Sequence, residues 1–160
     1  MYINCLLDKT NFDEIIKILV DKNLIVKNSD NLFLIKYDKE KCDMNCNDVK
    51  KCRGIILEKN TNKLVCVPPP FHEKLDIINN FNFGDLSCEE YVEGSMISVF
   101  KYNGEIKVST RSCIGANNKF YSRKTFMGMF SDVLNLDKFM FMPENMSLTF
   151  MIQHPENIIV

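Results

Sequence analysis

The feature that most constrains the fold is a pair of short runs, 96–102 and 105–110, on either side of Asn103-Gly104. Both runs are rich in strand-forming residues. The dipeptide Asn-Gly readily adopts the positive φ angles of a type I′ turn, whose twist matches that of two antiparallel strands. The spacing therefore predicts a β-hairpin over residues 96–110, and it places antiparallel β-structure in the fold.

Two segments show the spacing of amphipathic helices. The first, at residues 11–22, follows a variant capping box, Thr10-Asn11-Phe12-Asp13. The second covers residues 122–136. In each segment apolar residues recur three or four positions apart, and they are Phe12, Ile15, Ile16, Leu19 and Val20 in the first and Phe126, Met129, Phe130, Val133 and Leu134 in the second. We predict a helix at each place.

Further short apolar runs complete the predicted pattern. Strands are predicted at residues 31–37, 53–57, 63–67 and 147–152. The charged, aperiodic stretch 38–51 is predicted to be an exposed loop. The sequence therefore favours an α+β fold with antiparallel sheets and flanking helices.

Length and composition fit an ordinary globular protein. The 160 residues match one domain, 1–160, that is large enough to bury a core. The 20 basic and 21 acidic residues nearly cancel, which argues against a nucleic-acid coat protein but leaves room for a local basic groove. We find no secretory signal and no apolar stretch of the roughly 20 residues that span a bilayer, so we expect no membrane association.

Seven cysteines occur at irregular positions, and their odd number argues against a disulfide framework. Cys42 and Cys46 fit the first half of a zinc motif, but no second close pair or nearby histidine follows. His72 and His154 lie far along the chain. We therefore expect free thiols instead of zinc, in a reducing intracellular, cytoplasmic compartment.

Five short blocks occur in a fixed order along the chain. They are Cys52-Arg53-Gly54-Ile55-Ile56-Leu57-Glu58, Pro70-Phe71-His72-Glu73-Lys74-Leu75, Glu93-Gly94-Ser95, Ser109-Thr110-Arg111-Ser112 and residues 150–160. In this order they resemble the ATP-dependent RNA ligases of the phage type, in the covalent nucleotidyltransferase superfamily. The resemblance implies a partial nucleotidyltransferase (ATP-grasp-like/DNA-RNA ligase) adenylation domain. It is also consistent with a protein of viral or phage origin.

The resemblance also implies roles for individual residues. Arg53, Lys74 and Arg111 fall on positions that contact nucleotide phosphates. Glu93 falls on a carboxylate that holds ribose or metal, and Gly94 on a glycine that lets the backbone approach the nucleotide. ATP and Mg²⁺ are the implied cofactors, and RNA ends are the implied partner. The oligomeric state has no signal in the sequence.

Tyr91 occupies the position of the nucleophilic lysine. Covalent nucleotidyl transfer needs an unprotonated amine, whereas tyrosine carries a phenol with a pKa near 10 and a different reach. Lys74 or Lys101 would have to reach the α-phosphate to replace it. Other positions also depart from the family pattern, namely Glu93 for aspartate, Ser112 for glycine, Met151 for glutamate and Ile158 for arginine. The later Glu-Gly and Lys-x-Lys elements have no counterpart in the 160 residues.

Two functional hypotheses follow. The first is an RNA-ligase-like nucleotidyltransferase domain, related to ATP-dependent joining of RNA ends but inactive or incomplete. The alternative is a non-catalytic module, derived from a ligase, that binds RNA, nucleotides or protein. A capping-type guanylyltransferase shares the covalent chemistry but fits the blocks at 70–75 and 150–160 less well.

A small basic and aromatic patch overlaps the start of the second predicted helix. Its members are Lys119, Tyr121, Arg123 and Lys124. A solvated helix face is the expected interpretation, and contact with an RNA backbone is the alternative.

Overall fold

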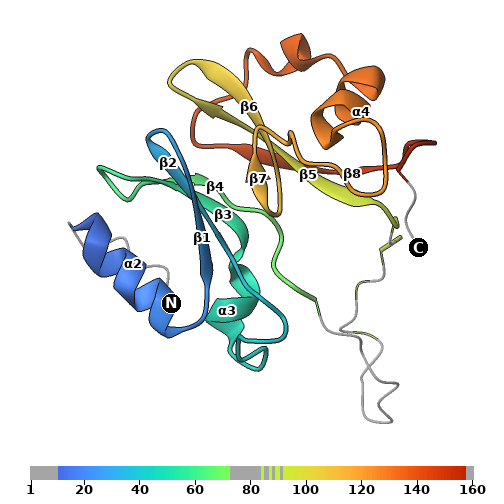
Figure 1. Cartoon of the computed structure of the whole chain (residues 1–160). Helices are drawn as coiled ribbons and strands as arrows, with labels where there is room; N and C mark the ends of the chain where they lie inside the picture. Colours follow the sequence, from blue (N-terminus) through green and yellow to red (C-terminus); the bar gives the residue numbers. More distant parts are fainter. Residues whose placement is uncertain (1–10, 73–83, 85–86, 88, 91, 158–160) are drawn as a thin grey trace.

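Two four-stranded antiparallel sheets face each other in the computed structural model, which describes residues 11–72, 84, 87, 89–90 and 92–157 (Figure 1). Sheet A contains, in spatial order, β1 (Ile25–Ser29), β2 (Leu32–Lys36), β3 (Arg53–Glu58) and β4 (Leu64–Cys66). Sheet B contains β7 (Cys113–Ile114), β6 (Glu105–Thr110), β5 (Ser95–Tyr102) and β8 (Ser147–Ile152). The predicted α+β class with antiparallel sheets is confirmed.

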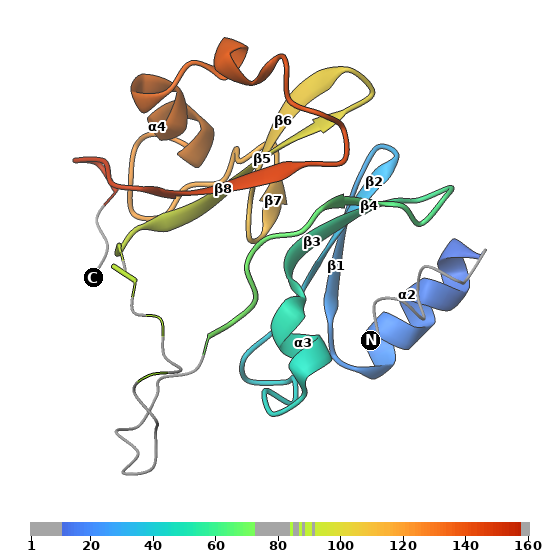
Figure 2. The same cartoon turned by 180° about the vertical axis from the view of Figure 1, so that it is seen from behind.

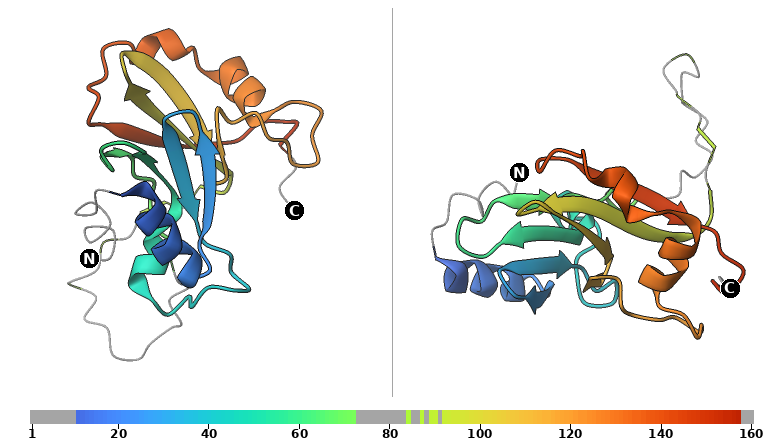
Figure 3. Two further views of the ribbon diagram at one scale, coloured as in Figure 1. Left: turned by 60° about the vertical axis from the view of Figure 1, so that its left-hand side comes forward. Right: turned by 90° about the horizontal axis from the view of Figure 1, so that it is seen from above.

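Helices cover the outer faces of the two sheets, on opposite sides of the molecule (Figures 1 and 2). Helix α2 (Phe12–Asp21) packs on sheet A, and α4 (Phe126–Val133) packs on sheet B. A single-turn helix, α3 (Asn47–Lys51), precedes β3, and a 3₁₀ helix, η2 (Leu136–Phe139), follows α4. Figure 3 shows the same arrangement from two further sides.

Strand alternation divides the core into three layers. On β2, Phe33 and Ile35 pack toward α2, whereas Leu34 packs toward sheet B. On β5, Val99 packs toward α4, whereas Phe100 packs toward sheet A. Each sheet therefore buries both faces, and the layer between the sheets is apolar at its centre.

The hairpin predicted around Asn103-Gly104 is confirmed. Residues 97–102 of β5 pair with 105–110 of β6, and Tyr102 lies opposite Glu105. Asn103 and Gly104 have φ angles of 52° and 80°, as a type I′ turn requires.

The loop predicted at 38–51 is wrong in part. The segment includes α3, and its Cys42 and Val49 are buried in the core beneath α2. A helix of one turn offers too few positions for a periodic pattern, so the sequence could not indicate it.

The second predicted helix is shorter than residues 122–136. It begins after Thr125, whose hydroxyl accepts a hydrogen bond from the Gly128 amide at 3.0 Å, and it ends at Val133. This N-cap fixes the start of the helix four residues later than the apolar pattern predicted. All four members of the basic and aromatic patch therefore lie in the loop before α4, not on a helix face.

Two strands were not predicted. β1 carries Lys27 and Asn28 among its five residues, and β7 has only two residues. Neither is long enough or apolar enough to show a period of two.

Along the described ranges, no helix has the length and apolar character needed to cross a membrane. The five described cysteines are free thiols. Burial raises the pKa of the Cys52 thiol to about 12, and this thiol donates to the Asp48 carbonyl. The same ranges contain no group of three His, Cys, Asp or Glu side chains placed to hold a metal ion.

Candidate functional site

A close backbone contact joins the two sheets at one end of the layer between them. Gly54, near the start of β3, has a φ of +95°, and a Cβ there would lie 2.9 Å from the Cα of Arg111. Only glycine fits both this positive φ and this separation without displacing backbone. The contact brings Arg53 from sheet A next to Arg111, which directly follows β6 of sheet B.

A cavity of about 330 Å³ opens at this contact. Ten residues from both sheets and from the loop before α4 line it: Arg53, Ser95, Met96, Thr110, Arg111, Ser112, Asn118, Lys119, Phe120 and Phe126. Three of these residues are cationic, and no carboxylate occurs among the described residues that line the cavity. We define this region as the cationic cavity. Its volume lies at the lower end of the range for small-molecule sites.

Arg53 has a buried guanidinium nitrogen without a partner. Its Nη1 donates to the Pro70 carbonyl at 3.3 Å. Its Nε is inaccessible to solvent and has no hydrogen-bond acceptor among the described residues. A buried donor left unpaired costs about 1–3 kcal/mol. Arg53 is therefore held at the wall of the cavity at a cost in stability.

Arg111 is held against an aromatic ring. Its guanidinium carbon lies 5.4 Å from the centre of the buried Tyr37 ring, within the range of a cation–π contact. Tyr37 in turn packs edge-to-face against Phe71, with 6.0 Å between ring centres. This packing restrains Arg111 and leaves its charge without a carboxylate partner among the described residues.

A third cation lies close to the two arginines. Lys36 is opposite Arg53 in the register of β2 and β3. Its pKa is lowered, first by burial and then by the positive charges of Lys27 and Arg111. The nearby Asp38 carboxylate acts in the opposite direction on this pKa and is the smallest of the four causes.

Hydrogen bonds fix the polar wall of the cavity. The Ser95 hydroxyl donates to Oδ1 of Asn157 at 3.1 Å, and Nδ2 of the buried Asn157 donates to the Ile152 carbonyl at 3.1 Å. The Thr110 hydroxyl donates to Oδ1 of Asn118, also at 3.1 Å. The block at 150–160 therefore contributes to the site indirectly, because Asn157 orients Ser95.

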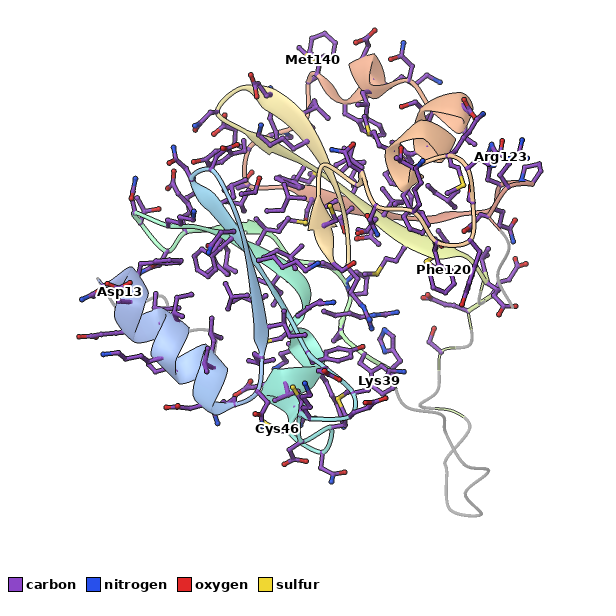
Figure 4. All side chains as sticks on the ribbon, in the orientation of Figure 1. Asp13, Lys39, Cys46, Phe120, Arg123 and Met140 are labelled. Carbon is purple, nitrogen blue, oxygen red and sulfur yellow. The ribbon has the colours of Figure 1, made fainter. Side chains whose placement is uncertain are left out.

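The remaining wall is apolar and includes two phenylalanines. Phe126 is 7 % exposed and also belongs to the core between sheet B and α4. Phe120 is 55 % exposed, and Figure 4 shows it beside the first residues of β5. A cationic wall facing an apolar wall suits a ligand that combines phosphate with an aromatic ring.

The predicted site residues fall into three groups. Arg53 and Arg111 both line the cavity. Gly94 lies beside it, where a Cβ would come within 2.7 Å of the Ile152 carbonyl oxygen. Glu93 is exposed and outside the lining, with its backbone carbonyl accepting from Gln153. Lys74 and Tyr91 lie outside the described residues. The five assigned binding roles, including that of Glu93 toward metal, remain predictions.

Several cavity residues were not anticipated as a site. Met96, Asn118 and Phe120 had no assigned role, and Lys119 was assigned to a solvated surface. Met96 looked like any residue of the predicted hairpin. Asn118 and Phe120 sit in an irregular loop, whose path no periodic pattern predicts. The sequence offered one signal, the adjacent aromatics Phe120 and Tyr121 within a polar stretch, and the structure shows both side chains exposed.

The described residues of the cavity do not provide the ligands that the implied Mg²⁺ prefers. Magnesium prefers carboxylate oxygens, and none lines the cavity within the described part of the chain. Glu93 is the nearest assigned candidate by sequence, but it is exposed and stands alone. We therefore derive no step through a protein-bound metal.

Comparison with known proteins gives one informative similarity. No family model matches the chain. The chain is 29% identical, over 138 residues, to a protein of Autographa californica nuclear polyhedrosis virus that is named as a bifunctional polynucleotide kinase/RNA ligase. The match covers 77% of this chain but only 20% of the viral protein, so the chain spans about a fifth of that relative. The similarity supports a distant RNA-ligase-like relationship.

Proposed function

We propose that this chain is a nucleotidyltransferase-like domain, descended from an ATP-dependent RNA ligase, that binds ATP in the cationic cavity without forming a covalent adenylate. One observation carries the proposal. Arg53 and Arg111 come from different sheets and converge on one cavity that has no carboxylate among its described lining residues. The similarity to the viral kinase/ligase supports a nucleotide as the ligand.

The two walls of the cavity suit the two parts of a nucleotide. Phosphate oxygens accept hydrogen bonds from guanidinium groups in pairs, and such charge-assisted bonds are about twice as strong as neutral ones. Arg53 and Arg111, which both line the cavity, would supply these guanidinium donors. Met96, Phe120 and Phe126 offer the apolar surface against which a base would pack.

The absence of covalent chemistry is inferred from Tyr91 and from the placement of nearby lysines. Lys119 lines the cavity, but its side chain is exposed, whereas the nucleophilic lysine of such an enzyme must be positioned closely against the α-phosphate. Lys36 has a lowered pKa but is not part of the lining. Lys101, considered above as a substitute, donates to the Met140 carbonyl at 2.8 Å at the opposite end of β5.

Calorimetric titration with ATP tests the binding step. We expect Arg53→Gln and Arg111→Gln each to weaken ATP affinity about tenfold, the loss of one or two charge-assisted hydrogen bonds. Lys138→Gln is the matched control, because it removes one exposed positive charge on η2, outside the cavity. Equal affinity in all four proteins would contradict the proposal.

Incubation with labelled ATP and Mg²⁺, followed by denaturing electrophoresis, tests the covalent step. We expect no labelled protein band. A band that survives denaturation would overturn the non-covalent proposal. Its loss in Lys36→Ala, Lys74→Ala, Lys101→Ala or Lys119→Ala would then identify the nucleophile.

The alternative of a non-catalytic RNA-binding module has its own experimental signature. Weak ATP binding combined with salt-sensitive RNA binding would favour it, because neutralised phosphates release counterions. The exposed loop before α4, which borders the cavity, is the observation that bears on this alternative.

A further inference from the structure

Two adjacent aromatic side chains stand at the mouth of the cationic cavity. Phe120 lines the cavity and is 55% exposed, and Tyr121 is 80% exposed. Their ring centres are 4.4 Å apart and their planes meet at 64°, an edge-to-face contact. The apolar core leaves both rings uncovered, although burying an aromatic ring is normally favourable.

The loop that carries these rings is fixed at both ends. The Phe126 amide donates to the Asn118 carbonyl at 3.1 Å, and the Met127 amide donates to the Ala116 carbonyl at 2.9 Å. Tyr121 also has a φ of +53°, a conformation that costs a residue with a Cβ roughly 1–2 kcal/mol. The fixed loop therefore presents the Tyr121 ring to solvent at a conformational cost.

Two exposed cations flank the aromatic pair. Neither Lys119 nor Arg123 forms an ion pair within the described part of the chain. Lys124 differs, because it pairs with Asp132 and, at 3.8 Å, with Glu156. The positive charge of residues 119 and 123 is therefore available to a ligand, whereas that of residue 124 is already balanced.

This combination fits single-stranded nucleic acid. Exposed aromatic rings stack on bases of any sequence, and neighbouring cations contact the phosphates of the strand. An apolar protein partner would need neither cation. The exposed Phe141 provides the contrast, since it is 97% exposed but its chain neighbours are Met140 and Met142.

We propose that Phe120 and Tyr121, flanked by Lys119 and Arg123, form a stacking platform for the end of a single-stranded RNA at the mouth of the cationic cavity. The platform places the last bases on the rings and the backbone along the two cations. The choice of RNA rests on the proposed ligase-like function. The platform would then position a strand end beside the bound nucleotide.

Fluorescence anisotropy with a short, 5′-phosphorylated, single-stranded RNA tests the platform. We expect Tyr121→Asn to weaken binding at least about fivefold, because it removes the stacking ring. Asparagine tolerates the left-handed backbone at this position, so the loop can keep its shape. Tyr121→Phe retains the ring and should bind within about twofold of wild type.

The salt dependence tests the cations separately. We expect Lys119→Gln and Arg123→Gln each to reduce the slope of log affinity against log salt by about 0.7, the value for one phosphate contact on a single strand. Lys138→Gln is the control and should leave the slope unchanged. Phe141→Asn removes an exposed aromatic ring next to Met140, whose carbonyl accepts from Lys101 at the end of β5 away from the cavity, and should leave affinity unchanged.

The outcomes separate the platform from the proposed nucleotide site. RNA binding that is absent, or that Tyr121→Asn and Phe141→Asn weaken equally, overturns the platform whatever ATP does. If Tyr121→Asn loses RNA affinity while Arg53→Gln and Arg111→Gln leave ATP affinity unchanged, the platform is supported and only the nucleotide site is overturned.

Discussion

The two ends of the layer between the sheets are built from the same strands but differ in how far their charged side chains are balanced by opposite charges. At one end, which we call the balanced end, the Tyr102 hydroxyl donates to Glu58 at 2.7 Å. The amide of Gly104 donates to Glu144, also at 2.7 Å. A smaller cavity of about 90 Å³ there is lined by two lysines and two glutamates. At the other end, the cationic cavity has three basic residues and no acid among its described lining residues.

This difference indicates which end of the layer between the sheets is the better candidate for a binding site. Lysines and glutamates lie together at the balanced end, so the same fold could place carboxylates beside the basic residues at the cationic end. The Nε of Arg53, which has no acceptor among the described residues, carries a cost in stability at the cationic end. Unbalanced charge at one end, beside balanced charge at the other, favours a binding site over a structural explanation.

Removing the apolar centre of the layer should have the largest effect, because both ends depend on it. Phe100 is fully buried between the sheets. We expect Phe100→Ala to lower the free energy of unfolding by about 3–5 kcal/mol, from lost burial and a residual cavity. Urea denaturation measures it. The exposed Phe141→Ala should change stability by about 0.5 kcal/mol or less; equal effects would contradict the three-layer core.

Breaking the contact between the sheets at the cationic end should come next. We expect Gly54→Ala to cost about 2–4 kcal/mol, because its Cβ would meet the backbone of Arg111 and its φ is positive. Gly104→Ala is the matched control at the balanced end. Gly104 also has a positive φ, +80°, but a Cβ there would meet nothing within 4 Å. Its cost should be about 1–2 kcal/mol, and an equal loss of stability in urea would show that the close approach is unimportant.

Charge removal at the two ends should affect ATP binding unequally. We expect Arg111→Gln to weaken ATP affinity about tenfold, whereas Lys101→Gln at the balanced end should change it less than about twofold. Each variant loses one positive charge, so the comparison cancels the change in net charge. Similar losses of ATP affinity in the two variants would mean that the affinity depends on the overall charge of the protein and not on the cationic cavity.

The smallest predicted effect concerns pH at the balanced end. Hydrogen bonds from Thr61 and then Tyr102 lower the pKa of Glu58 below its ordinary value of 4.5. The folded state therefore holds this proton less tightly than the unfolded state does. Its contribution is present above about pH 4.5 and is lost as the pH falls through the lowered folded pKa.

We therefore expect the wild-type protein to lose more unfolding free energy between about pH 6 and pH 3 than Glu58→Gln does, by about 1 kcal/mol or less. Denaturation in urea at several pH values measures the difference. Parallel pH profiles for the two proteins would contradict the assigned cause of the shift.

Local sequence signals predicted those parts of the fold that local interactions decide. Asn103-Gly104 specifies a turn through its own φ angles, and the helix at 11–22 is defined by its apolar spacing. Strand β7 depends on pairing with β6 and has only two residues, so it carries no pattern of its own. Thr125 set the start of α4 through one hydrogen bond that the apolar pattern could not reveal.

The site was predictable only in part for a similar reason. Arg53 and Arg111 were singled out by resemblance, but their convergence has a physical cause in Gly54, whose missing Cβ admits the backbone of Arg111. Phe120 lies in an irregular loop that reaches the cavity through the hydrogen bond between Thr110 and Asn118. Contacts between segments far apart in sequence made the rest of the site, and a single sequence does not encode them as a local pattern.

The most direct test is a titration with ATP followed by the backbone amide signals in NMR spectra. We expect shifts at the cationic cavity, in Arg111, Ser112, Asn118 and Lys119, and unchanged signals for Glu58, Tyr102 and Gly104. Shifts at the balanced end instead, or no shift at saturating ATP, would contradict the assignment of the cationic cavity as the nucleotide site.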